Sequence, residues 1–245
     1  MVNKMCTAAE AVSAIKDGDV IAVGGFLGTG SPEILMDALV AQGTKHLTVI
    51  ANDGGLNEEN APTNGKLKGI GKLLRNHQID VLIASHIGVN PDINRQINEG
   101  TLKYVLYPQG TLAEKLRCAG AGMGGFYTRA GVSTLMEEEH CDTQGHLLET
   151  TYMKEKKIVD GKEYMFELPL KPKFSLVRAD FCDKFGNFAM LEATKNFNHV
   201  MAMAAEHTIL ASEKVFEIGE KEPDFYQVSG VLVEKIVEGE PAWQI

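Results

Sequence analysis

Nine consecutive residues, Gly24-Gly25-Phe26-Leu27-Gly28-Thr29-Gly30-Ser31-Pro32, have the composition of a loop that binds anions through its backbone. Glycines carry no Cβ and let backbone N–H groups approach a ligand closely. The segment lies between an apolar run at 19–23 and a stretch whose apolar residues recur at helical spacing over 34–39. Ser31 fits the N-cap and Pro32 the first position of that helix, whose positive dipole end then faces the loop. We therefore expect a phosphate or carboxylate to bind here.

The same loop matches neither common nucleotide-binding motif. It contains no G-x-x-x-x-G-K-[ST] sequence. Gly28 and Gly30 have the first spacing of G-x-G-x-x-G, but Glu33 stands where the third glycine is required. From these residues alone, a ligand-binding loop and a tight turn without a ligand both remain open.

Apolar runs and helical patterns alternate through the first half of the chain, which is typical of an α/β fold with a mainly parallel open sheet and helices on both faces. Such sheets bind ligands at the carboxyl ends of their strands. From about Gly145 the pattern changes to short β-forming segments and turns, which predicts a β-hairpin region packed on the main sheet. No linker-like composition interrupts residues 1–245, so we predict a single domain. The expected strands are 20–23, 47–51, 81–84, 102–106, 174–179 and 208–211. One helix is expected to begin near Thr7 with a Thr7/Glu10 capping box, and the other expected helices span 32–41, 67–76, 91–99, 111–117 and 198–206.

Composition narrows the classes of partner and compartment. A formal net charge of -9 is unlike the basic surface of a nucleic-acid-binding protein, so no nucleic acid is expected. The four cysteines and seven histidines form neither C-x-x-C nor H-x-x-x-H spacings, so we expect no metal site and a cytoplasmic location. His86 is therefore interpreted as a surface or structural residue, and Glu137–Glu139 as a solvated acidic turn. No apolar run reaches membrane-spanning length, so no membrane partner is expected.

Three further segments follow the glycine-rich loop along the chain. They are Tyr-Pro-Gln-Gly-Thr-Leu-Ala-Glu at 107–114, Asp-Lys-Phe-Gly-Asn at 183–187 and Thr-Lys-Asn-Phe-Asn at 194–198. Together with the Gly-Gly-Phe loop at 24–32, they resemble the alpha (A-type) subunit of family I coenzyme A transferases, the 3-oxoacid CoA-transferase group. The stretch 162–170 is most similar to the acetoacetate/butyrate (acetate) branch. The longer region 53–71 and the loop Gly122–Phe126 depart from the family pattern, which bears on substrate identity.

The resemblance implies a ping-pong transfer of coenzyme A between a short-chain acyl-CoA and a free short-chain carboxylic acid such as acetoacetate, butyrate or acetate. A glutamate attacks the thioester, and the covalent intermediates that follow preserve the free energy of the thioester bond. In the family this glutamate lies on the beta subunit, in a Ser-Glu-Asn-Gly-type motif. The closest segments here, Glu59-Asn60-Ala61 and Ser212-Glu213-Lys214, each share only two letters with it. The expected partner is therefore a CoA-transferase beta subunit, in a heterodimer or heterotetramer, with coenzyme A as a substrate and no permanently bound cofactor.

The resemblance also assigns roles to individual residues. Gln109 is implied to donate its side-chain amide to the developing oxyanion and to orient the substrate; the alternative is a glutamine that only satisfies a turn. Asn52, at the end of a strand, is placed to orient a carboxylate, although such residues are often turn formers. The residues implied to line the CoA or acyl pocket are Gly24, Gly25, Phe26, Leu27, Gly28, Thr29, Gly30 and Asn52.

Other functions remain open at this stage. Alpha subunits of succinyl-CoA:3-oxoacid and 3-oxoadipate CoA-transferases share the same motifs. A small-molecule effector-binding domain of the same fold is a non-enzymatic alternative, because fold alone does not determine function. A CoA hydrolase or transferase built from one chain would need its own catalytic glutamate, and the missing motif counts against it.

Overall fold

The computed structural model describes residues 3–59 and 66–241. Within them, an eight-stranded sheet has seven strands that pair in parallel, and β11 pairs antiparallel with β10. Apolar runs rich in β-branched residues form its central strands, because these strands are buried on both faces. The mainly parallel sheet expected from the sequence is confirmed. In spatial order the strands are β13 (Val233–Glu238), β12 (His207–Phe216), β10 (Phe174–Asp183), β1 (Val20–Val23), β2 (Leu47–Ala51), β3 (Ile79–Ala84) and β4 (Lys103–Leu106), with β11 (Phe188–Ala189) beside β10.

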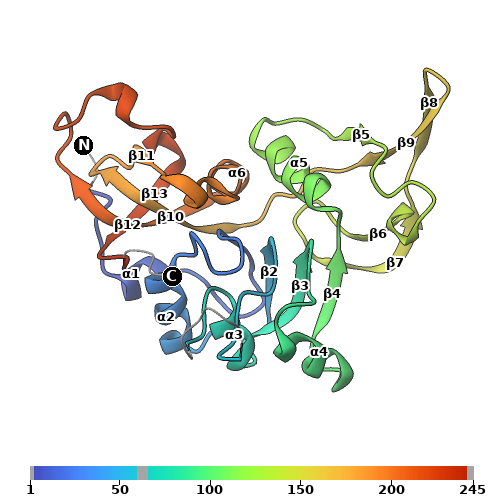
Figure 1. Cartoon of the computed structure of the whole chain (residues 1–245), viewed down its shortest axis with the longest axis horizontal. Helices are drawn as coiled ribbons and strands as arrows, with labels where there is room; N and C mark the ends of the chain where they lie inside the picture. Colours follow the sequence, from blue (N-terminus) through green and yellow to red (C-terminus); the bar gives the residue numbers. More distant parts are fainter. Residues whose placement is uncertain (1–2, 60–65, 242–245) are drawn as a thin grey trace.

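Helices cover both faces of this sheet (Figure 1). Helices α1 to α4 contribute to one core and α5 and α6 to the other, where α5 and α6 also pack on each other. None of the helices in the described ranges has the length and apolar content needed to cross a bilayer. The helices are α1 (Ala8–Val12), α2 (Glu33–Gln42), α3 (Gly71–Arg75), α4 (Pro91–Asn98), α5 (Gln109–Gly120) and α6 (Asn198–Ala204), with 3-10 turns at Leu135–Glu137, Glu192–Lys195, Pro223–Phe225 and Gly230–Leu232.

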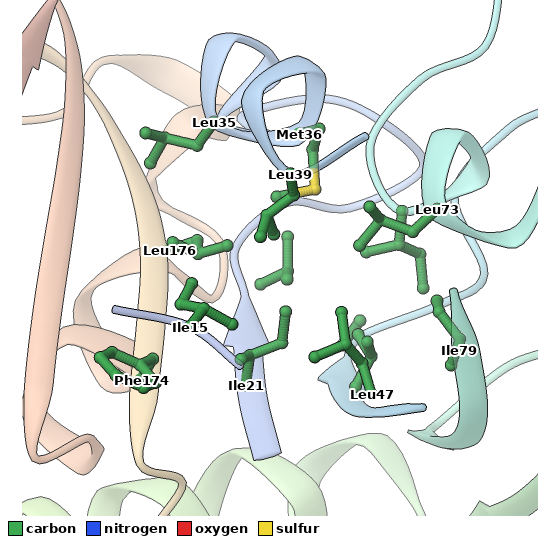
Figure 2. Packing of buried hydrophobic residues seen from close by; sticks show 14 of the residues in the cluster. Ile15, Ile21, Leu35, Met36, Leu39, Leu47, Leu73, Ile79, Phe174 and Leu176 are labelled. Carbon is green, nitrogen blue, oxygen red and sulfur yellow. The ribbon is translucent and has the colours of Figure 1, made fainter. Parts of the chain in front are cut away.

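The core under α2 shows how the sheet and helices are joined. Leu35, Met36 and Leu39 of α2 point toward the strands, where they meet apolar side chains such as Ile21 and Leu176 (Figure 2). All five are completely buried. This packing fixes the direction in which α2 leaves the loop that precedes it.

Two small antiparallel sheets form the predicted hairpin region. One has the order β5-β9-β8 and the other pairs β6 with β7. The β5-β9-β8 sheet extends away from the main sheet beyond α5 (Figure 1), whereas the turn between β6 and β7 packs on the main sheet, because a Cβ on Gly145 would lie 2.9 Å from Val20 Cγ1. The region begins earlier than the expected Gly145, because β5 and β6 precede that residue. The strands are β5 (Phe126–Thr128), β6 (Glu138–Cys141), β7 (Leu147–Met153), β8 (Lys156–Val159) and β9 (Lys162–Glu167).

Two expected helices differ from the structure by several residues in length, and those expected over 91–99 and 198–206 end one and two residues earlier. One N-terminal cap agrees. The Thr7/Glu10 capping box is present. The helix expected over 67–76 is confined to α3, because Lys68 exchanges backbone hydrogen bonds with Leu56 and is therefore extended. The helix expected over 111–117 instead begins at Gln109 and ends at Gly120.

Candidate functional site

Four loops follow the carboxyl ends of the parallel strands β1 to β4 and lie at one edge of the sheet. The strand order reverses between β1 and β10, and ligands of open α/β sheets bind at such a position. The glycine-rich loop leaves β1 at this point. We call the four segments Gly24–Gly30, Asn52–Asn57, Ser85–Val89 and Pro108–Gln109 the loop cluster.

The glycine-rich loop is a tight hairpin. Phe26 and Thr29 exchange backbone hydrogen bonds of 2.9 Å, and the central residues Leu27 and Gly28 have φ values of 46° and 79°, as in a type I′ turn. The Phe26 side chain is 45% exposed. The hairpin thus presents an aromatic ring at its surface.

Several N–H groups of the hairpin already donate hydrogen bonds within the chain, which reduces the number of donors left for the anion expected from the sequence. The amides of Gly24, Phe26, Leu27 and Thr29 donate to acceptors within the chain. Those of the other three glycines, which are buried residues, have no acceptor in the described ranges, so these three are the unpaired donors of the loop. They belong to Gly25, Gly28 and Gly30.

The segment Thr194–Asn198 packs against the glycine-rich loop and is hydrogen-bonded to it. Asn196 Nδ2 donates to the Thr29 carbonyl (2.9 Å), and Asn198 Nδ2 donates to the Gly30 carbonyl (3.0 Å). A Cβ on Gly24 would lie 1.8 Å from Asn198 Oδ1, so only glycine fits at position 24. The sequence pointed to both segments but not to their contact.

Asn52 lies in the loop cluster with its side chain engaged by neighbours. It is 2% exposed, and its Nδ2 donates to Asp53 Oδ2 (2.8 Å). Asp53, which sequence reasoning did not single out, also accepts from the N–H groups of Leu27 (2.8 Å) and Gly55 (2.9 Å). Asp53 therefore ties the loop after β2 to the glycine-rich hairpin.

Gln109 is the first residue of α5 and is exposed. Pro108 precedes it, and the helix starts directly after β4. In the described parts of the chain the Gln109 side chain makes no hydrogen bond, so its amide is free to donate to a ligand at the sheet edge.

The N-terminus of α2 is already occupied by a carboxyl group of the chain itself. The Glu33 and Ile34 N–H groups donate to Glu240 Oε1 (2.9 Å) and Oε2 (3.0 Å). The helix begins at Glu33, and Ser31 makes no cap because its hydroxyl lies against the backbone of the glycine-rich loop. The prediction that Ser31 is the N-cap and Pro32 the first helical residue is wrong. An external anion is therefore left with the free loop amides and not with this helix end.

Burial raises the pKa of Glu240 to about 7, while the two N–H donors and Arg178 act in the opposite direction. Arg178 Nη1 lies 3.5 Å from Glu240 Oε1, and the same guanidinium also pairs with Glu213. Glu213, one of the two glutamates compared with the family nucleophile, is thus part of an ion pair. Of the other segment, Glu59 is described, whereas Asn60 and Ala61 lie outside the described residues.

Beside the loop cluster, five buried polar side chains form a closed network that we call the buried ion cluster. The Tyr107 hydroxyl donates to Glu139. Lys115 Nζ lies 3.2 Å from Glu139 Oε2 and 2.9 Å from Glu167 Oε2, and Lys154 Nζ lies 2.7 Å from Glu167 Oε1. Each residue is at most 5% exposed. The network joins α5 to the hairpin region.

The cluster corrects the interpretation of Glu137–Glu139 as a solvated turn, because Glu139 is buried. Burial alone would raise the pKa of Glu139, but Lys115 and Lys154 hold it below its usual value. Burial and the neighbouring Glu139 raise the pKa of Tyr107. One signal was available in the sequence, since Lys115 lies between Leu112 and Leu116 on the apolar face of its helix.

Comparison with known proteins identifies the family. The family described as Coenzyme A transferase matches residues 5–239. This chain belongs to the coenzyme A transferase family. The expected family and enzyme class are therefore confirmed.

Named relatives of this coenzyme A transferase chain come from transferases of several types. It is 38% identical over 237 residues to the alpha subunit of acetate CoA-transferase from Escherichia coli (strain K12), covering 97% of both chains. It is 39% identical over 230 residues to the acetoacetyl-CoA:acetate/butyrate CoA transferase alpha subunit of Clostridium acetobutylicum, covering 94% of both. It is 37% identical over 239 residues to the A-type subunit of succinyl-CoA:3-ketoacid coenzyme A transferase from Helicobacter pylori (strain J99), covering 97% of this chain and 93% of that one.

Solved structures share the fold of this coenzyme A transferase chain. Glutaconate coenzyme A-transferase from Acidaminococcus fermentans superposes with a TM-score of 0.77 at 18% identity, over 96% of this chain and 75% of that one. An acyl-CoA transferase from Escherichia coli O157:H7 gives 0.76 at 23% identity, over 96% of this chain and 47% of that one. At these identities the comparison supports the fold alone.

Proposed function

We propose that this chain is the alpha subunit of a two-subunit enzyme that transfers coenzyme A between a short-chain acyl-CoA and a free short-chain acid. The observation that carries the proposal is near full-length similarity to the alpha subunits of acetate and acetoacetate/butyrate transferases. The relative from a succinyl-CoA:3-ketoacid transferase has nearly the same identity, which keeps that acid pair as the alternative substrate set. For either set of substrates, the expected partner is a beta subunit.

The loop cluster supports a nucleophile on another chain. The only carboxylate in the cluster is Asp53, which is 5% exposed and accepts hydrogen bonds from several N–H donors. A nucleophilic carboxylate must instead expose an oxygen to the thioester carbon. The cluster therefore supplies donors and an apolar surface, and the attacking glutamate comes from the beta subunit.

Six of the nine predicted site residues have a role in this scheme. Gln109 donates to the oxyanion that forms when the glutamate attacks the thioester. The free amides of Gly25, Gly28 and Gly30 bind acyl or carboxylate oxygens, and the exposed Phe26 ring lines the acyl chain. Asn52 acts on the acid indirectly, because its side chain holds Asp53, which accepts from the Leu27 N–H of the glycine-rich loop. Coenzyme A enters as a substrate and leaves with the product.

The test uses this chain purified alone and co-purified with a candidate beta subunit. Transfer from acetoacetyl-CoA or succinyl-CoA to acetate, butyrate or acetoacetate is measured by product formation. We expect activity only in the mixture. Mass spectrometry after incubation with acyl-CoA should locate the coenzyme A adduct on a glutamate of the beta chain. Comparable activity, or an adduct, on this chain alone would contradict the proposal.

A further inference from the structure

His86 follows β3 and lies between two parts of the loop cluster. Ser85 N donates to the Asn52 carbonyl (3.0 Å), and His86 forms an isolated parallel bridge with Asp53. On the other side, Tyr107 N donates to the Ala84 carbonyl (3.0 Å), so the chain next to His86 runs beside the start of Pro108–Gln109. His86 is therefore located between the residues proposed to orient and to polarise the substrate.

The backbone around His86 is held in place while its ring faces solvent. A Cβ on Gly88 would lie 3.3 Å from His86 Cε1 and 3.6 Å from Nε2, so one edge of the imidazole rests against this glycine. Asn90 Nδ2 anchors the end of the loop through the Gly54 carbonyl (2.8 Å). The residue itself is exposed.

The chemical setting of His86 differs from that of three other histidines. His46, His146 and His207 each lie within 3.2 Å of a carboxylate oxygen. His86 has no such partner in the described ranges. It is also the only basic side chain in the loop cluster, where the remaining free donors are uncharged amides.

We propose that His86 is a substrate-contacting residue that donates an imidazole N–H to the carboxylate of the free acid. This rests on the proposed function and adds a residue to its site. An imidazole keeps at least one N–H donor in each of its protonation states. The carboxylate of the free acid carries a charge that the thioester group lacks, and hydrogen bonds to charged groups are stronger than those to neutral ones. The contact therefore favours binding of the acid substrate.

The test compares His86→Ala with the unchanged protein, each assembled with the beta subunit. We expect the KM for the free acid to rise about tenfold and the KM for the acyl-CoA to stay within about twofold. A small acid makes few other contacts, whereas the coenzyme A moiety provides most of the binding surface of the thioester. His86→Gln keeps an N–H donor and should give an intermediate KM. His77→Ala, at an exposed position beside the opposite end of β3, should change neither constant.

The outcomes separate this inference from the proposed function. No transfer by the unchanged complex, under any acid pair, would overturn the proposed function and with it the role of His86. Normal transfer by the unchanged complex, with an acid KM in His86→Ala that stays within about twofold, would overturn the inference alone. Equal losses for both substrates, accompanied by a lower melting temperature and no recovery in His86→Gln, would assign His86 a structural role and also overturn it.

Discussion

The buried ion cluster and the loop cluster adjoin at residues 107–109, yet they use polar groups in opposite ways. Tyr107 contributes its hydroxyl to the first, and Gln109, two residues later, offers its amide to solvent in the second. In the ion cluster every charged group faces an opposite charge. In the loop cluster, some N–H donors have no acceptor in the described ranges. Polar groups that satisfy one another stabilise an arrangement, and groups held in place without a partner are available to a ligand.

Removing one cation from the buried ion cluster should have the largest effect. Lys115→Met leaves Glu139 and Glu167 buried with less compensation, and we expect a loss of about 3–5 kcal/mol in the free energy of unfolding. Urea unfolding followed by circular dichroism measures it. Lys156→Met, whose more exposed ammonium pairs with Glu137 and Glu163, is the control and should cost at most about 1 kcal/mol. Equal losses in the two variants would remove the distinction between buried and exposed pairs.

Gln109→Ala should act on the rate and not on stability. We expect kcat to fall about 100-fold, because one oxyanion donor is lost. The free energy of unfolding should change by less than about 0.5 kcal/mol, since the residue is exposed. Gln144→Ala, an exposed glutamine in the hairpin region, is the matched control and should leave kcat unchanged. An unaltered kcat in Gln109→Ala would remove Gln109 from the site.

Gly24→Ala tests how the loop cluster is held. The new Cβ would meet Asn198 Oδ1 and displace a side chain that is completely buried. We expect a loss of about 1–3 kcal/mol in the free energy of unfolding, with a larger KM for the acid. Gly110→Ala, where a Cβ meets nothing within 4 Å, is the control and should be neutral. If both variants were neutral, the contact between the two segments would not determine the loop.

Glu240 is an intermediate case, because it is buried like the ion cluster but only partly compensated. Its pKa is raised to about 7 from 4.5, so the folded chain holds a proton that the unfolded chain releases between these values. Stability from this group is present at low pH and falls as the pH rises through 7. Glu240→Gln should remove this slope and gain on the order of 1 kcal/mol relative to the unchanged chain between about pH 5 and pH 8. Glu222→Gln, on the surface, should leave the slope as it is; identical slopes in all three proteins would show that Glu240 does not titrate in this range.

Much of the sheet could be predicted because its signals are local. The strands β1 and β2 were placed to the residue, and β3 begins two residues before its expected start. The glycine-rich segment was placed correctly at the end of β1. Which of its amides remain free was not predictable, since that depends on acceptors elsewhere in the chain. The single domain, the cytoplasmic location and the roles of the site residues stay predictions.

By itself, the sequence determined the alternation of strands and helices, the position of the loops at the carboxyl edge and the family motifs. These follow from side-chain periodicity and from the backbone freedom of glycine, which act over a few residues. Only the tertiary structure decided that Glu240 occupies the start of α2, that Asn198 supports the glycine-rich loop, and that Lys115 meets Glu167. Those contacts join residues 207, 168 and 52 positions apart. They depend on how the packed elements bring distant charges and amides together, and burial then makes each unpaired group too costly to leave alone.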